Sequence, residues 1–364
     1  VHVVVSDTTA EVGNNAVIDG DSDLRVRADS NTEIDALNGN LSLAGVAAVG
    51  AAVATNVITN STTARIGDSA KTDADDVTEV SADSVSDLET IGVAASGGGV
   101  GVAGGIQVNV VSTTAQSSIG QNAMVNTAGT GNTGQAVKVT ATDSSTINSD
   151  TGAIALGAVG VGGALSVDIL RNSASATIGN SAQVNAEDSI DVSANTVKKL
   201  DAKSVSAAAG GFGMSGSIAV AAIGGDLNDD AYSEINGEDE GGNDNSDSGS
   251  INKAGSSSSV NPLASDDEDS QLNDFNATSS LADDVDERNA EREADYGVGD
   301  DVAKSADPRS GTLAAVGSNA TLKAGGNLNV TAQDTTTTNM LAGAVAAGGV
   351  AGAGAAAITV VENN

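Results

Sequence analysis

Carboxylates are the only side chains in this sequence that are numerous enough to suggest chemistry. The 364 residues include 49 Asp and Glu, 15 Lys and Arg, a single histidine and no cysteine. Because the histidine is His2, we expect neither histidine-based catalysis nor a histidine metal site. Without cysteine there is no disulfide and no thiolate metal site. We therefore predict that the protein is not an enzyme and has no catalytic or cofactor-binding residue.

Calcium (Ca²⁺) is the metal that these carboxylates suit best, because it prefers about six to eight hard oxygen ligands. Candidate ligands gather in one acidic segment, at Asp226, Asp229, Asp230, Asp266, Asp267 and Asp269. Neither an EF-hand loop nor the Gly-Gly-x-Gly-x-Asp nonapeptide is intact in the sequence. A solvated acidic surface is the plainer interpretation of this segment, and a calcium site is the alternative.

Two further kinds of site are disfavoured by the residues around them. Residues 97–101 are rich in glycine like a phosphate-binding loop, but no Lys-Ser or Lys-Thr pair follows them. A β-helix enzyme that cleaves acidic polysaccharides would need basic and aromatic side chains beside its acids. Basic residues are sparse here and aromatic residues make up 1% of the chain. A polysaccharide-processing enzyme therefore stays only as a less favoured alternative.

The formal net charge of −34 limits the partners of the chain. It excludes electrostatic binding of nucleic acid, which needs Lys and Arg to neutralise phosphates. It also disfavours docking on anionic membranes. Strong acidity keeps a long array soluble and self-repelling, and it suits a saline medium.

A repeated phrase must position all of these residues. The phrase is a β-branched residue, Gly, any residue, Asn or Ser, and Ala, and its copies are residues 12–16, 66–70, 119–123, 178–182 and 316–320. The first four copies begin 53 to 59 residues apart, which identifies a repeat architecture. We expect the glycine to adopt positive φ in a turn, with the Asn or Ser bonding to nearby backbone.

Strands are expected on both sides of the phrase. Apolar and polar residues alternate before it, as in Ile106–Val110, and after it, as in Ile190–Ala194. Such alternation predicts half-buried strands with their apolar residues on the core face. Tracts of Ala, Gly and Val join these strands, at residues 43–54, 91–105, 154–163, 205–217 and 341–357. A membrane span is one interpretation of the tracts. However, frequent glycine disfavours a helix, and small residues let two sheets approach closely.

These features favour an all-β fold, a parallel β-helix (β-solenoid) of about five repeats with a thin core. If each repeat made two or three coils, stacking at about 4.8 Å would give a rod on the order of 50–70 Å long. A β-roll or a stacked two-sheet sandwich is the alternative arrangement of the same strands.

An acidic insertion divides the repeats. We assign residues 1–225 to the solenoid repeats, 226–309 to the insertion and 310–364 to the final repeat. The insertion holds 24 of the 49 acids and five of the 15 bases, a composition typical of segments that do not order themselves. Residues 277–296, with Leu281 and Val285 and with Ser279 or Ser280 as cap, could form one helix. We expect the insertion to project from a corner of the rod.

The phrases, the Val-x-Val-x-Ala strands such as Val137–Ala141 and the Ala/Gly/Val tracts resemble the repeats of giant bacterial surface adhesins. These are the filamentous-haemagglutinin-like and leukotoxin-like β-helical exoproteins, and the resemblance covers residues 1–225 and 310–364. It implies export to the cell surface, an extended filament and an adhesive, envelope-forming or biofilm role, and it brings no catalytic residue.

We therefore expect a non-catalytic structural or adhesive segment of a giant extracellular surface protein. Both ends of the sequence lie within the repeat pattern, so we expect a piece of a longer chain. Its expected partners are copies of itself, adjoining repeats and a cell-surface or extracellular polysaccharide, without nucleic acid or membrane insertion. A calcium-responsive binding module centred on the insertion is the main alternative.

Overall fold

The structure is a computed structural model, and it describes residues 1–127, 131–224 and 311–361. The regular elements of these residues are all β-strands, as predicted. Their bounds are β1 His2–Val12, β2 Val17–Gly20, β3 Leu24–Leu43, β4 Ala47–Ile66, β5 Lys71–Ala74, β6 Val77–Ile119, β7 Met124–Val125, β8 Ala136–Ile178, β9 Gln183–Ala186, β10 Ile190–Ile223, β11 Thr312–Val316, β12 Thr321–Ala324 and β13 Leu328–Val361. A helix long and apolar enough to cross a membrane is not found in these ranges.

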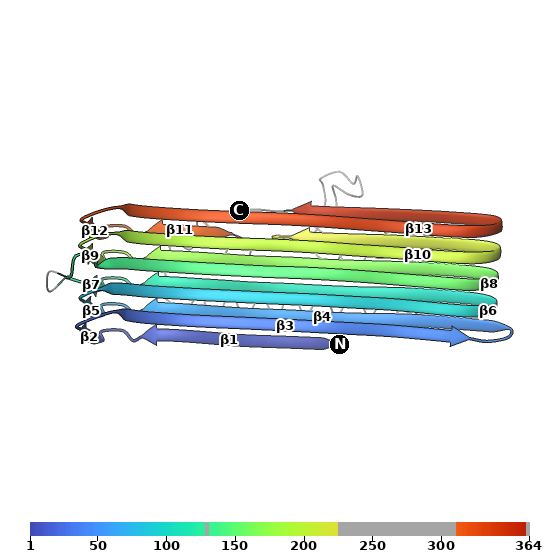
Figure 1. The fold of residues 1–364 in the computed structure, drawn as a ribbon, viewed down its shortest axis with the longest axis horizontal. Helices are drawn as coiled ribbons and strands as arrows, with labels where there is room; N and C mark the ends of the chain where they lie inside the picture. Colours follow the sequence, from blue (N-terminus) through green and yellow to red (C-terminus); the bar gives the residue numbers. More distant parts are fainter. Residues whose placement is uncertain (128–130, 225–310, 362–364) are drawn as a thin grey trace, which may run out of the picture.

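Equivalent strands of successive repeats pair in parallel (Figure 1). His2 of β1 lies opposite Asn56 of β4, and Val77 of β6 lies opposite Ala136 of β8. These offsets of 54 and 59 residues equal the spacing of the repeated phrase, so the phrases stack in one column. The parallel, all-β architecture predicted from that spacing is confirmed.

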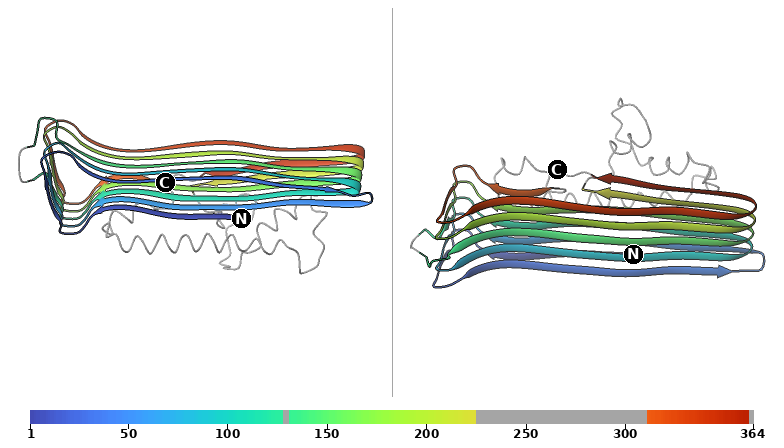
Figure 2. Two further views of the ribbon diagram at one scale, coloured as in Figure 1. Left: turned by 60° about the horizontal axis from the view of Figure 1, so that its bottom comes forward. Right: turned by 45° about the horizontal axis from the view of Figure 1, so that its top comes forward.

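Each repeat runs out along one layer and back along a second (Figure 2). The outgoing layer comprises residues 24–43, 77–98, 136–157, 190–210 and 328–348. The return layer comprises residues 2–12, 47–66, 100–119, 159–178, 212–223, 312–316 and 350–361. A bend joins the layers at what we call the distal end. At the opposite, proximal end, the phrases lead into a second sheet made of β2, β5, β7, β9 and β12.

The expectation of two or three coils per repeat, and of a rod of 50–70 Å along the stack, is wrong. Alternation continues through each Ala/Gly tract, so the strand does not turn until the glycines of the distal bend, such as Gly98 and Gly157. Each repeat therefore adds one strand to each layer, or about 4.8 Å along the stack. The 20-residue strand β4 spans about 65 Å, so the long dimension follows the strands (Figure 1).

The proximal turn also differs from its prediction, because the residue with positive φ is the Asn or Ser and not the glycine. The φ values are 58° at Asn15, 55° at Ser69, 54° at Asn122, 57° at Ser181 and 59° at Asn319. Asparagine tolerates this left-handed region better than most residues.

The glycine of the phrase is needed for a different reason, because consecutive turns stack in contact. A Cβ on Gly67 would lie 2.5 Å from Oδ1 and 2.7 Å from the backbone nitrogen of Asn14 in the neighbouring turn. No side chain fits at that distance. Close approach of two backbones, and not a positive φ, therefore selects glycine here.

A ladder of side-chain amides and carboxylates ties the proximal turns together. The backbone N–H of Asp68 donates to Oδ1 of Asn14 (2.8 Å), and the N–H of Gln121 donates to Oδ1 of Asp68 (2.8 Å). The N–H of Ser318 donates to Oδ1 of Asn180 in the same way (2.7 Å). The residue after the glycine thus fixes the register of one turn on the next.

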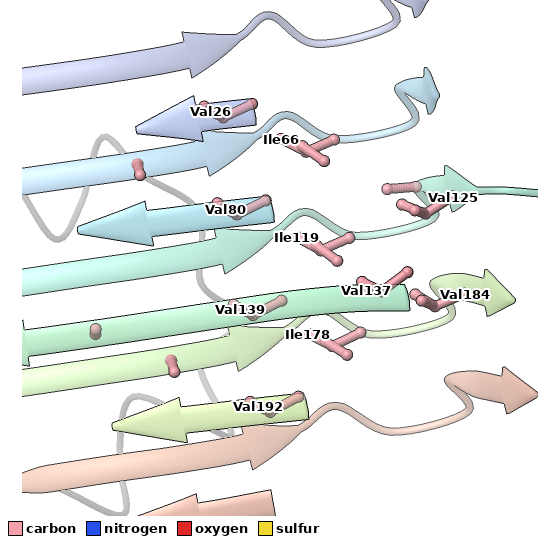
Figure 3. Close-up of a cluster of buried hydrophobic side chains, with 14 of the residues drawn as sticks. Val26, Ile66, Val80, Ile119, Val125, Val137, Val139, Ile178, Val184 and Val192 are labelled. Carbon is pink, nitrogen blue, oxygen red and sulfur yellow. The ribbon is translucent and has the colours of Figure 1, made fainter. Parts of the chain in front are cut away.

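Buried apolar side chains form three clusters along the layers. The proximal cluster contains valine and isoleucine, including Val26, Val80, Val139, Val192, Ile66, Ile119 and Ile178 (Figure 3). The middle cluster includes Leu88, Ile147, Leu200, Ile58, Val111 and Leu170. The distal cluster contains only alanine: Ala52, Ala94, Ala103, Ala153, Ala155, Ala164 and Ala208. The core therefore thins steadily toward the distal bend.

The insertion does not start at a corner, and that expectation is wrong. Ile223, the last residue of β10, lies opposite Leu170 of β8, and Thr312, the first residue of β11, lies opposite Ala174. The chain thus leaves and re-enters the return layer in the middle of one strand. The helix expected at residues 277–296, like the rest of the insertion, lies outside the described residues.

Candidate functional site

The outer face of the outgoing layer carries the largest exposed apolar surface of the described residues. Its distal half has a group of outward aliphatic side chains, each at least 36% exposed, which we call the distal aliphatic surface. Its members are Leu37, Leu41, Leu43, Ile91, Val93, Ile154, Leu156, Val205, Leu341 and Val345. A contiguous apolar surface of this kind marks a site for an apolar partner.

The two layers touch beneath this surface, which explains why the aliphatic side chains face outward. A Cβ added to Gly105 would lie 2.8 Å from the carbonyl oxygen of Gly152, and one on Gly160 would lie 2.9 Å from that of Ala209. In both cases the neighbour is backbone of the facing layer. The interior here has room for alanine and glycine alone, so larger side chains fit only outside.

One ion-paired group interrupts the distal aliphatic surface. Lys203 Nζ lies 2.7 Å from Asp201 Oδ1 and 3.4 Å from Asp150 Oδ1. Asp201 and Asp150 help raise the pKa of Lys203, with the hydrogen bond from Asp201 as the main cause. Because the lysine is about half exposed, this cluster contributes little to stability. It marks the boundary between the aliphatic distal half and the polar proximal half of the face.

The outermost strands offer a second kind of contact. Along its length β13 pairs with β10 alone, and β3 pairs with β6 alone. Each therefore presents a row of backbone N–H and C=O groups without a strand partner among the described residues. Such edges are templates for pairing with another strand.

A column of buried polar side chains, the proximal polar column, separates the proximal and middle clusters. Asp143 Oδ1 accepts hydrogen bonds from Thr113 Oγ1 (2.8 Å) and from Asn172 Nδ2 (3.0 Å). In the neighbouring repeat, Asn60 Nδ2 donates to Ser86 Oγ (2.8 Å). Asp143 is fully buried, and desolvation raises its pKa to about 7 although these hydrogen bonds oppose the rise. The carboxyl is therefore half protonated near neutral pH.

A buried lysine continues this column. Lys198 is fully buried, and its Nζ donates to Oδ2 of Asp334 in the next repeat (2.7 Å). Lys198 lies opposite Ser145, two residues along the strand from Asp143, and its charge lowers the pKa of Asp143 slightly. A buried ammonium group needs such a carboxylate partner, so Lys198 fastens the final repeat to its neighbour.

The distal polar column separates the middle and distal clusters. Asp168 accepts hydrogen bonds from Asn109 Nδ2 (2.7 Å) and from Ser166 Oγ (2.7 Å). Asn56 Nδ2 extends the column by donating to Asn109 Oδ1 (2.9 Å). Asp168 is also fully buried, and desolvation raises its pKa to about 6.

The two aspartates have pKa values suited to general acid–base catalysis, but their positions do not suit a substrate. Asp143 and Asp168 lie between the layers with no exposed surface, so a substrate cannot reach them. Their hydrogen bonds instead join the outgoing strands to the return strands. These networks hold the two layers in register.

The predicted calcium ligands cannot be placed. Asp226, Asp229, Asp230, Asp266, Asp267 and Asp269 all lie outside the described residues. Within the ranges that the structure describes, no group of three or more His, Asp or Glu side chains could hold a metal ion. His2 begins the exposed edge strand β1, and residues 97–101 form part of the distal bend within β6.

Sequence reasoning missed the polar columns because it placed the wrong face of the return strands inside. The alternation predicts Ile106, Val108 and Val110 on the core face, whereas Gln107 and Asn109 face inward and the aliphatic residues face outward. The signal was present, since an amide recurs at equivalent positions of consecutive repeats. Only the packing of the layers shows which face lies inside.

The chain was compared with protein-family models, with curated proteins and with solved structures, and none of the three comparisons found a match.

Proposed function

We propose that this chain is a structural and adhesive segment of an extracellular surface protein or filament, and that it is not an enzyme. In this proposal the parallel layers form an extended β-helix that presents its faces to partners. The observation that carries the proposal is the distal aliphatic surface, where ten aliphatic side chains from consecutive repeats face solvent. Such an array offers an area of contact and no pocket for chemistry.

Copies of the chain, or adjoining repeats of a longer chain, are the partners that this architecture suits best. The open edges of β3 and β13 support stacking of further repeats, because paired interior strands have the same parallel register. The distal aliphatic surface supports lateral contact. A cell-surface or extracellular polysaccharide is a further proposed partner, and the cell surface is the proposed location.

Paired charge substitutions test this proposal. Ile154→Glu with Leu156→Glu would place two charges on the distal aliphatic surface. The matched control, Thr140→Glu with Thr142→Glu, adds the same charges to the proximal half of the same face and the same strand. Sedimentation and electron microscopy measure self-association, and an adherence assay on coated surfaces measures adhesion.

The first pair is expected to abolish lateral association or adhesion, and the second to leave both unchanged. Equal behaviour of the two double variants would remove the distal aliphatic surface from the proposal. Loss of neither activity in either variant would contradict an adhesive role for this face.

A calcium-responsive module is the second candidate, favoured by the gathering of 24 of 49 acids in the insertion. Its test is the melting temperature of the whole chain with calcium and with EDTA. A rise with calcium that EDTA reverses is expected, and identical melting would rule the module out. A polysaccharide-processing enzyme gains no support, since the two aspartates with raised pKa values are enclosed.

A further inference from the structure

The outer face of the return layer carries an aliphatic band of its own, which we call the return band. It consists of outward residues from three consecutive repeats: Ile106, Val108, Val110, Leu165, Val167, Ile169, Ile218, Val220 and Ala222. At the same depth the outgoing layer presents Asp87, Glu89 and Asp201 to solvent. The two outer faces therefore differ in character although their strands are continuous.

The return band is covered, whereas the distal aliphatic surface is open. The outward residues Val108, Val167 and Ala222 are 4%, 7% and 1% exposed. Val93, which faces outward on the outgoing layer from the same strand as Val108, is 42% exposed. Burial alternates along the outgoing strands, but along the return strands both faces are buried over several residues.

The described strands do not provide this cover. Residues 1–127, 131–224 and 311–361 form two layers and the proximal sheet, with no described strand outside the return layer (Figure 2). The chain leaves the return layer at Gly224, two residues after Ala222, and returns at Gly311. The intervening 86 residues therefore begin and end beside the return band.

Charge favours the same segment. Arg171 faces outward in the return layer next to the point where the chain departs, and it is 4% exposed. A guanidinium stays protonated, so its burial calls for an acidic partner. Residues 225–310 include 24 of the 49 acids of the chain.

We propose that residues 225–310 pack back against the return band and cover it. The insertion is then a part of the fold that shields one apolar face and leaves the distal aliphatic surface as the accessible one. The order of the strand explains how this is achieved, because both ends of the insertion emerge within the layer that it covers.

Cysteine labelling tests the proposal cleanly, because the chain has no cysteine. Val108→Cys probes the return band, and Val93→Cys is the matched control on the same strand and on an outer face. In the full chain we expect maleimide to label the first cysteine at least about tenfold more slowly than the second, as local opening must precede reaction. Light scattering on the same samples reports whether the chain is a monomer.

A shortened chain supplies the second arm. Residues 224–311 are replaced by Arg-Asn-Ser, the three residues that β8 has between Leu170 and Ala174. With this replacement Val108→Cys is expected to react as fast as Val93→Cys. Equal rates in the full chain would overturn the proposal. Slow labelling in both chains, or in a full chain that is a dimer, would assign the cover to a second copy and also overturn it.

A crosslink in the full chain keeps the test decisive if the shortened chain does not fold. A diazirine amino acid at position 108 is photolysed and the crosslinked peptides are mapped. Crosslinks to peptides from residues 225–310 of the same molecule are expected. Crosslinks to another molecule, or to solvent alone, would contradict the proposal.

Discussion

The proximal and distal regions of this protein place their large side chains on opposite sides of the same sheet. In the proximal region valine and isoleucine fill the interior and charged or hydroxyl side chains face solvent. In the distal region alanine fills the interior, while leucine, isoleucine and valine face solvent. The strands pass from one region to the other without a break.

The separation of the two layers accounts for this inversion. The five-stranded proximal sheet keeps the layers apart at one end, so there is a volume that large side chains must fill. At the distal end a tight bend brings backbone against backbone, and glycine faces the carbonyl groups of the other layer. Hydrophobicity alone therefore does not decide which side chains are buried here, because available volume decides first.

Raising the pH is expected to have the largest effect, because it brings charge into the polar columns between the regions. Asp143 and Asp168 have folded pKa values of about 7 and about 6, above the ordinary 3.8. The folded state therefore keeps protons that the unfolded state loses, and stability falls from about pH 4 until the pH passes 7. For Asp143 alone the loss is on the order of 4 kcal/mol.

Urea unfolding at pH 5 and pH 8 measures this loss. Asp143→Asn cannot ionise, so the stability of this variant is expected to depend less on pH than that of the natural chain. An unchanged pH dependence in the variant would show that the buried carboxyl does not couple to folding.

Truncating isoleucine should have opposite consequences in the two regions. Ile178→Ala empties part of the proximal cluster and is expected to lower the free energy of unfolding by about 3 kcal/mol. Ile154→Ala, on the same strand but 45% exposed in the distal region, is expected to change it by less than about 0.5 kcal/mol. Chemical denaturation of both variants measures the contrast, and similar losses would contradict the inversion.

Enlarging alanine should be harmful only between the distal layers. Ala155→Leu introduces a large side chain where the layers are in contact, and we expect a loss of about 2 kcal/mol from overpacking. Ala95→Leu adds the same volume to the outer face of the outgoing layer and should stay within about 0.5 kcal/mol. Thermal unfolding distinguishes them, and tolerance of Ala155→Leu would show that the distal interior has free space.

The smallest expected effect concerns the proximal turn. Asn122 has a φ of 54°, so Asn122→Ala should cost about 1 kcal/mol from backbone strain. Asn122→Gly removes the same side chain without that strain and serves as the control. If both variants lose the same stability in denaturation experiments, then a side-chain contact and not the backbone conformation determines the choice of asparagine.

Part of the candidate site was readable from the sequence, since the Ala/Gly tracts predicted a close approach of two sheets. The tracts at residues 91–105 and 154–163 do lie where the layers touch. The distal aliphatic surface was not predicted, because Ile154 and Leu156 lie inside one of these tracts and were taken as part of a small-residue wall. The predicted calcium ligands lie outside the described residues, so they remain a prediction.

The sequence by itself determined the repeat length, the parallel all-β class and the set of residues that share each face of a strand. A period of two fixes which side chains lie together, and a constant spacing of the phrases fixes which strands are neighbours. The tertiary structure alone decided that each repeat passes once through each layer, and that Asn109 and Asp168 face inward while Val108 and Val167 face outward. The reason is that alternation is symmetric between the two faces of a strand, and only the distance to the facing layer determines which face is the interior.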